Sequence, residues 1–234
     1  MSVVAAGFIP AAPLLIPDLC GDAVERDADL RDRVRAVVAA VAAAGSAVIV
    51  IGLANEASTY SGTWDFSSLG MPIRGAGTGT LPISLGIGAW FLDDVGYAGP
   101  REYVGIPDRA PAAACVALGA SLARDRDVAL LVVGDGSARR DEKAPGWLDP
   151  RAADFDKDVA DALATGDPGA LRELPQEMAT ELLAAGRAPW QVAAGATQGR
   201  SWRASQVVTD ARYGVGYVTA VWLPHLDSNQ EPLD

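Results

Sequence analysis

The densest group of chemically active side chains follows the most apolar run of the chain. Asp135 and Ser137 come first, and a charged stretch with Arg139, Arg140 and Lys143 follows. Arginine binds carboxylates and phosphates through paired hydrogen bonds, so this segment could line a pocket for a small anion. The alternative is a solvated loop in which Asp135 and Ser137 cap the local backbone and the charged residues form surface ion pairs.

Two further groups of polar residues could contribute to such a pocket. Asn55 follows a second apolar run at residues 47–52, and Arg187 is close in sequence to Trp190 and Gln191. Arg187 and Gln191 would add hydrogen-bond donors to a pocket wall, whereas a tryptophan such as Trp190 is more often packed in a core. Open α/β sheets bind ligands beyond the carboxyl ends of their strands, so we expect the site in the loops after the apolar runs.

Nucleophilic and metal chemistry have little support in this sequence. His225 is the single histidine, so Ser137 lacks a histidine base and cannot act as the nucleophile of a triad. Cys20 and Cys115 are far apart without metal-binding spacing, and we interpret them as reduced, buried, small apolar side chains. The glycine-rich segment 75–79 lacks the lysine of a phosphate-binding loop. We therefore expect no metal and no cofactor.

The charge of the chain excludes several classes of partner. The formal net charge is −11, from 30 acidic and 19 basic residues. Such a surface repels phosphate backbones and anionic lipids, so we expect neither nucleic-acid binding nor membrane-surface binding. The first 19 residues are apolar but contain no basic residue and are broken by three prolines, which favours a strand and loop over a signal peptide. We expect a cytoplasmic protein.

The N-terminal third has the pattern of a βαβ unit. Residues 3–9 are continuously apolar, as in a buried strand, and residues 23–44 place apolar side chains on one helical stripe. A second strand follows at residues 47–52, so the sheet is at least partly parallel. Residues 53–82 have no regular pattern, and irregular segments of this length are commonly functional or formerly functional loops.

The remaining two thirds alternate helices and strands and end in a strand pair. Asp149 is expected to cap a helix that has Pro150 in its first turn. The other predicted helices span residues 85–95, 110–124, 176–185 and 189–197, and the other strands span residues 103–106, 128–133, 202–209 and 215–223. The order of these elements predicts one α/β domain over residues 1–224.

Three loops resemble those of one known family. Residues 10–15 read Pro-Ala-Ala-Pro-Leu-Leu, residues 53–56 read Leu-Ala-Asn-Glu, and residues 134–140 read Gly-Asp-Gly-Ser-Ala-Arg-Arg. Their order resembles the class III extradiol ring-cleavage dioxygenases and their LigB-like relatives, which include the Memo-type proteins. The segments KAPG at 143–146 and GRAPWQV at 186–192 are similar to those of LigB-like proteins from high-GC Gram-positive bacteria.

The resemblance covers most of residues 3–223 and implies both a fold and a metal site. The fold would be a single-domain three-layer sandwich, with a mixed, largely parallel sheet and helices on both faces. The family dioxygenases hold Fe(II) with two histidines and a carboxylate. In this chain Ala11 occupies the first histidine position, Ala54 or Asn55 the second, and Ala138 the position of the acid/base histidine. Alanine offers no lone pair to a metal, so we do not expect iron-dependent ring cleavage.

These observations predict a LigB-like protein without the iron site, either non-catalytic or repurposed. Its pocket would bind a small molecule, for example an anion, or a protein partner, and the resemblance implies a homo-oligomer. One alternative is a metal-free enzyme with Asp135 as base and Arg139 or Lys143 as electrostatic stabiliser. Others are a structural subunit whose partner chain brings the active site, and an extradiol-type oxidoreductase whose metal ligands lie elsewhere.

The last ten residues, 225–234, are expected to form a disordered tail. Residues 227–229 read Asp-Ser-Asn, which the codons GAT-TCG-AAC encode, and these are complementary to the T-loop of tRNA genes. Our hypothesis is that the reading frame overlaps a tRNA gene on the opposite strand. His225 would then have no role in the protein, and reading the 3′ end of the gene would test this.

Overall fold

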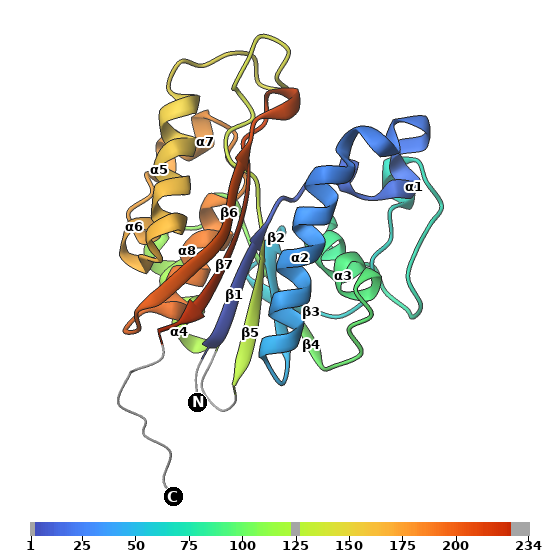
Figure 1. The fold of residues 1–234 in the computed structure, drawn as a ribbon, viewed down its shortest axis with the longest axis horizontal. Coiled ribbons are helices and arrows are strands. Elements are labelled where there is room, and N and C mark those ends of the chain that lie inside the picture. Colours follow the sequence, from blue (N-terminus) through green and yellow to red (C-terminus); the bar gives the residue numbers. More distant parts are fainter. Residues whose placement is uncertain (1–2, 123–126, 226–234) are drawn as a thin grey trace, which may run out of the picture.

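The computed structural model describes residues 3–122 and 127–225. Residues 226–234 of the tail predicted at 225–234, and the predicted end of the helix at residues 123–124, lie outside this description. Within it the chain forms a central sheet with helices packed on both faces (Figure 1).

The seven strands have the order β3-β4-β2-β5-β1-β7-β6. The four central strands β4, β2, β5 and β1 are parallel, whereas β3 at one edge and the β7–β6 pair at the other are antiparallel. The bounds are β1 Val3–Ile9, β2 Val48–Leu53, β3 Ser58–Tyr60, β4 Arg101–Ile106, β5 Val128–Val133, β6 Trp202–Asp210 and β7 Tyr217–Pro224. The sheet is therefore mixed and largely parallel, as expected.

The central strands are buried because they are apolar on both faces. All six residues of β5 are buried, and in β1 and β2 nearly every residue is. A parallel strand of this kind needs cover on both sides, since neither row of side chains can face water. The sequence of these strands alone thus requires a helical layer on each face of the sheet.

Helices supply those two layers. On one face α2 (Ala28–Ala44) and α3 (Ile83–Asp94) share a core with the sheet. The opposite face carries α4 (Ala112–Ser121), α5 (Ala152–Thr165), α6 (Pro168–Arg172), α7 (Gln176–Glu181) and α8 (Arg187–Thr197). Figure 1 shows both layers, with α1 (Pro17–Cys20) beyond the end of α2. The three-layer α/β sandwich is confirmed.

Several element boundaries differ from the prediction. The helix expected from residue 23 begins as a 3₁₀ segment at Gly21–Asp27, and α2 itself starts at Ala28. The helix expected after Asp149 starts at Ala152. Asp149 Oδ1 instead accepts a hydrogen bond of 3.0 Å from the Arg151 N–H, which closes the turn before α5. The predicted helix 176–185 ends at Glu181, because Leu183 adopts a left-handed conformation with φ 57°.

The segment predicted to be irregular, residues 53–82, is partly ordered. It contains β3 and the 3₁₀ turn Ser67–Leu69, and isolated bridges join Thr63 to Thr80 and Asp65 to Arg74. Trp64 stacks on Phe66, with ring centroids 5.6 Å apart, and its indole N–H donates to Asp93 on α3. The segment is therefore folded onto α3. Two further 3₁₀ turns, Pro13–Leu15 and Arg212–Gly214, and the short helix α6 were not predicted.

No helix in residues 3–122 or 127–225 is both long enough and apolar enough to cross a membrane.

Replacement of Gly7 by Ala tests the close contact between β1 and α2. A Cβ atom on Gly7 would lie 2.5 Å from Val41 Cγ2 and 2.8 Å from Val37 Cγ1, so the helix would have to move. We expect Gly7→Ala to lower the free energy of unfolding by about 1–3 kcal/mol, measured by urea denaturation. Gly86→Ala in α3 is the matched control.

The Cβ atom added by Gly86→Ala would have contacts of 3.6 Å or longer. Because alanine has the higher helix propensity, we expect this substitution to leave the free energy of unfolding unchanged or to raise it by up to about 1 kcal/mol. Equal effects of the two substitutions would contradict the packing described for β1 and α2.

Candidate functional site

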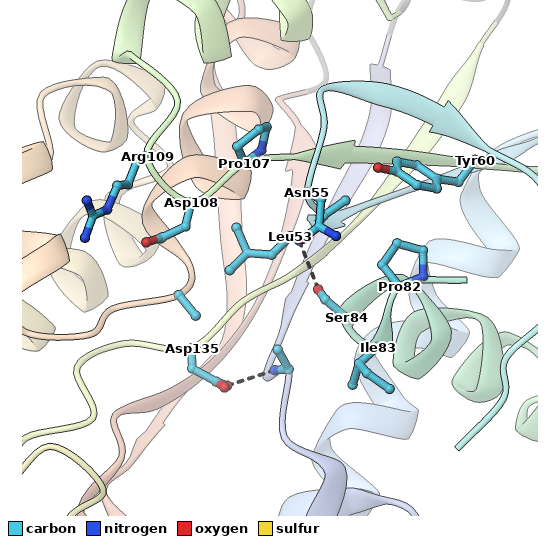
Figure 2. A pocket seen from close by; sticks show the side chains of 13 residues that line it. Leu53, Asn55, Tyr60, Pro82, Ile83, Ser84, Pro107, Asp108, Arg109 and Asp135 are labelled. Carbon is cyan, nitrogen blue, oxygen red and sulfur yellow. Dashed lines mark hydrogen bonds between the residues drawn. The ribbon is translucent and has the colours of Figure 1, made fainter. Parts of the chain in front are cut away.

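A cleft of about 850 Å³ opens at the carboxyl ends of the parallel strands. Loops after β1, β2, β4 and β5 contribute to it, together with the start of α3 (Figure 2). This is the edge of the sheet where open α/β folds generally place their sites. The lining residues are Ala11, Leu53, Ala54, Asn55, Tyr60, Pro82, Ile83, Ser84, Pro107, Asp108, Arg109, Asp135 and Ala185.

Asp135 is fixed in the cleft by the adjacency of β1 and β5. Its Oδ1 accepts a hydrogen bond of 2.8 Å from the Ala11 N–H in the loop after β1 (Figure 2). Its main-chain carbonyl accepts another of 2.7 Å from the Gly186 N–H, just before α8. Gly134 has no room for a side chain, since a Cβ there would lie 2.5 Å from Gly186 Cα. Backbone contacts on two sides thus determine where the carboxyl group lies.

The environment of Asp135 favours the protonated acid. Burial raises the pKa of this half-buried carboxyl to about 7, and the hydrogen bond from Ala11 opposes the shift only in part. Among the described residues Asp135 has no ion pair. Burial also raises the pKa of Tyr217, and the negative charge of nearby Asp135 raises it further. Asp135 is therefore a proton-exchanging group near neutral pH.

The other polar groups of the cleft differ in how firmly they are held. Ser84 Oγ accepts a hydrogen bond of 3.2 Å from the Leu53 N–H and donates one of 3.4 Å to the Val133 carbonyl. Tyr60 donates its hydroxyl to the Glu56 carbonyl at 3.2 Å. The exposed side chain of Asn55 has no hydrogen bond to another residue in the described part of the chain.

Asp108 and Arg109, after β4, are exposed and also have no side-chain partner among residues 3–122 and 127–225. In Figure 2 the guanidinium of Arg109 is directed away from Leu53 and Ser84. The cleft therefore offers one shielded carboxyl, that of Asp135, and a solvated rim of mixed charge.

The structure brings together four of the positions singled out in the sequence. Ala11, Ala54, Asn55 and Asp135 line the same cleft. Ala11, and Ala54 or Asn55, are the positions at which the resemblance predicted that ligand histidines had been replaced. The remaining predicted positions lie elsewhere, in two groups with different roles.

The first group is the charged loop after Asp135, which leaves the cleft and folds on itself. Ser137 is buried and donates its hydroxyl to Asp156 Oδ2 at 2.8 Å, and Arg140 binds the same oxygen at 3.0 Å. Arg139 donates to the carbonyls of Gly146 at 2.6 Å and Glu181 at 3.0 Å.

The two other residues of this group are also outside the cleft. Lys143 is exposed, and the main chain of Ala138 pairs with Leu182 and Gly146. The convergence of Arg139 and Lys143 with Asp135, which the metal-free enzyme hypothesis assumed, is not observed.

The second group, on α8, is structural. Buried Arg187 donates to the Ala110 carbonyl at 2.6 Å, to the Asp108 carbonyl, and to Gln191 Oε1 at 3.1 Å. Gln191 in turn donates to the carbonyls of Arg172 and Leu174. Trp190 is fully buried, and its indole N–H has no partner in the described structure. Arg187 thus holds the segment that carries Asp108 and Arg109 at the rim.

Sequence reasoning missed several residues of the cleft. Asp108 and Arg109 follow β4 directly, so the rule that found the loops after β1, β2 and β5 would also have found them. Tyr60 and Pro82 belong to the segment predicted to be irregular, and Ile83 and Ser84 begin α3 directly after it. Their approach to β2 and β5 depends on how that segment packs on α3, and no local motif indicates it.

The donor set does not fit the Fe(II) site of the resembled family. That site needs two imidazoles and a carboxylate, whereas the cleft has no histidine among its lining residues in the described part of the chain. Within the described residues no three histidine, cysteine, aspartate or glutamate side chains lie together in an arrangement that could hold a metal ion. Cys20 and Cys115 are both free, and Cys115 is buried.

Comparisons with known proteins leave the ligand open. A scan of family models and a search of curated proteins each found no match. Among solved structures, the chain is similar to "uncharacterized protein JW3007 from Escherichia coli K12", with 15% identity and a TM-score of 0.49. The alignment covers 93% of this chain and 99% of that one. Similarity of this degree says nothing about a ligand or an activity.

Replacement of Asp135 by Asn tests the raised pKa. The pKa of an aspartate is about 3.9 in an unfolded chain and about 7 here, so the folded state binds the extra proton between these values. Stability of the wild-type protein should therefore fall as pH rises from about 4 to about 7.

Relative to Asp135→Asn, we expect the wild type to lose about 1–3 kcal/mol of unfolding free energy between pH ~5 and pH ~8. Urea denaturation of both proteins at the two pH values measures this difference. If the unfolding free energies of the two proteins change equally with pH, burial does not destabilise the ionised carboxyl of Asp135.

Proposed function

We propose that this chain binds a small organic molecule in the cleft at the carboxyl ends of β1, β2, β4 and β5. The observation that supports this proposal is the half-buried carboxyl of Asp135, which has no ion pair among the described residues and lies in the cleft of about 850 Å³. Cavities of about 300–1,000 Å³ with apolar walls and a few oriented polar groups are typical of small-molecule sites. Leu53, Pro82 and Ile83 supply the apolar walls here.

The proposal also includes the relation to the LigB-like proteins. On this view the chain keeps their framework and uses the space of the iron site differently, with Ala11 and Ala54 where imidazoles would bind metal. Methyl groups at these positions enlarge the cleft and make its wall more apolar. The same substitutions argue against iron-dependent ring cleavage in this chain, because alanine cannot coordinate a metal.

A second candidate is a metal-free enzyme that uses Asp135 as a general base. A pKa near the working pH is what efficient proton transfer requires, and Asp135 has one of about 7. Among the described lining residues the cation is Arg109, and not Arg139 or Lys143; its guanidinium would have to turn into the cleft to stabilise developing negative charge. In this case Asp135→Asn would abolish turnover while a substrate still binds.

We further propose that the protein acts in the cytoplasm and self-associates. The two unpaired cysteines suit a reducing compartment. Support for self-association comes from an apolar patch formed by Trp147, Leu148 and Leu183, whose exposed fractions are 63%, 45% and 51%. Leu183 lies against Gly146, since a Cβ on that glycine would be 2.6 Å from Leu183 Cδ1.

Two residues of this apolar patch have costly backbone conformations. Trp147 and Leu183 have φ angles of 63° and 57°, in the left-handed region that costs about 1–2 kcal/mol for a residue with a Cβ atom. An isolated chain gains nothing from holding large apolar side chains in water in this way. Burial of the patch in an interface would offset the cost.

A second copy of the chain fits this patch by charge. Residues 138–151 together with Glu181 carry equal numbers of cations and anions, namely Arg139, Arg140, Lys143 and Arg151, and Asp141, Glu142, Asp149 and Glu181. The net charge of −11 is therefore carried by the rest of the molecule. Two acidic copies would repel each other least where their surfaces are locally neutral.

Blocking the cleft tests the binding proposal. In a fragment screen followed by ¹⁵N-correlated NMR, we expect the amide signals of Ala11, Ala54, Asp135 and Ala185 to shift on binding. Ala11→Trp should abolish these shifts by filling the cleft, whereas Ala117→Trp on the exposed face of α4 should leave them unchanged. Compounds that bind equally well to both variants would place the ligand outside the cleft.

Polar substitution of the apolar patch tests the self-association proposal. We expect light scattering to give the wild-type protein a molar mass that is a multiple of the mass of one chain. Trp147→Ser should lower this molar mass to that of one chain. Val208→Ser, at an exposed position on β6, is the control and should leave the mass unchanged. A monomeric wild type, or an oligomer that survives Trp147→Ser together with Leu183→Ser, would rule out this interface.

A further inference from the structure

The charged residues that line the cleft are mainly anions, whereas the loop after β5 had predicted a cationic pocket for an anion. Three of the 13 lining residues are charged, the anions Asp108 and Asp135 and the cation Arg109. The cations of the loop after β5 are directed elsewhere, with Arg139 on backbone carbonyls and Arg140 on Asp156. When Asp135 is ionised, an anionic ligand would therefore meet a net negative lining in a molecule that is itself strongly acidic.

The geometry points to a ligand with a positively charged amine, whose ammonium group pairs with the carboxylate of Asp135. This inference rests on the proposed function of the cleft and names the class of molecule that the cleft takes. It replaces the anion expected from the sequence by a cation.

The hydrogen bonding of Asp135 leaves a place for the ammonium group. Oδ1 accepts the Ala11 N–H at 2.8 Å, and Oδ2 has no hydrogen-bond partner among the described residues. An ionised carboxylate can accept about four hydrogen bonds, and an ammonium group donates three. The unused capacity of Asp135 is thus of the kind that an amine would satisfy.

Among the described residues that line the cleft, the cation is Arg109, and it is poorly placed to act as a counter-ion for Asp135. The ionisable groups near Asp135 are Tyr217 on β7, Tyr60 on β3, and Asp108 and Arg109 after β4. Arg109 is exposed to solvent, makes no ion pair with Asp135, and is directed away from the centre of the cleft (Figure 2). A ligand ammonium would supply the charge that these groups do not.

The same arrangement explains why a cation would be preferred over a neutral donor. The carboxylate of Asp135 is shielded from water without a counter-ion, so its ionised form is disfavoured until a positive charge arrives. Attraction between opposite charges is stronger in such a shielded site than in bulk water. The apolar body of the ligand would then contact Leu53, Pro82 and Ile83 on the other walls.

Binding of an amine should depend on pH in a defined direction. The ammonium group pairs with ionised Asp135, and a proton on that carboxyl competes with it. Since the pKa of Asp135 is about 7, affinity should fall about tenfold per pH unit below 7 and level off above it. A primary alkylammonium keeps its own charge throughout this range.

Three probes of the same shape separate the possibilities. Benzylamine, benzyl alcohol and benzoate differ in charge but share one ring, and each is titrated by ¹⁵N-correlated NMR at pH ~5.5, ~7 and ~8.5. We expect benzylamine to shift the amides of Ala11, Ala54 and Asp135 with at least about tenfold higher affinity than the other two at pH ~8.5, and to weaken at pH ~5.5.

Two variants complete the test. Asp135→Asn should remove both the preference for benzylamine and its pH dependence. Asp154→Asn removes the same charge from the exposed face of α5 and should change neither. If Asp135→Asn does not fold, the pH dependence of the wild type still tests the pairing.

The outcomes distinguish this inference from the proposed function. Benzyl alcohol or benzoate binding in the cleft as tightly as benzylamine would overturn the amine inference and leave small-molecule binding intact. Benzylamine binding with no pH dependence would exclude Asp135 as its partner. Absence of binding by all three probes, together with a failed fragment screen, would count against both proposals.

Discussion

The parallel pairing of β1 with β5 is the constraint on which the candidate site depends. It brings the ends of two strands that are more than a hundred residues apart in sequence to one edge of the sheet, where the Ala11 N–H meets the Asp135 carboxyl. Both strands are buried on both faces, so polar groups can appear only where the strands end. The cleft forms there because β2 and β4 continue the same parallel register on the other side of β5.

The sequence predicted the framework well because its signals are local. The continuous apolar runs of β1, β2 and β5 and the apolar stripe of α2 each lie within one element, and a βαβ order implies a parallel sheet. The boundaries that failed depend on single turns. Leu183 ends a helix early through a left-handed conformation, and Asp149 hydrogen-bonds the residue before α5 rather than its first turn.

The site was predicted only in part, because side-chain direction is not a local property. The charged run after Asp135 looked like one surface, yet Ser137 and Arg140 bind Asp156 on α5. Arg139 binds the carbonyl of Gly146 in its own loop and that of Glu181 at the end of α7. These partners lie up to 42 residues away in sequence. Arg187 and Gln191 were expected in a pocket wall and instead hold loops together from inside the core. Asp135 and Asn55 reach the cleft because they directly follow buried strands.

The two glycines behind Asp135 have a consequence for how this protein could change its ligand. A Cβ atom on Gly134 would lie 2.5 Å from Gly186 Cα, and one on Gly186 would overlap the indole of Trp190, so neither position accepts a side chain. A side chain at either glycine position would therefore have to displace main chain or the indole of Trp190. Changes in selectivity, whether natural or engineered, are therefore easier at lining positions such as Leu53, Ile83 and Tyr60, which can vary in size while Asp135 stays in place.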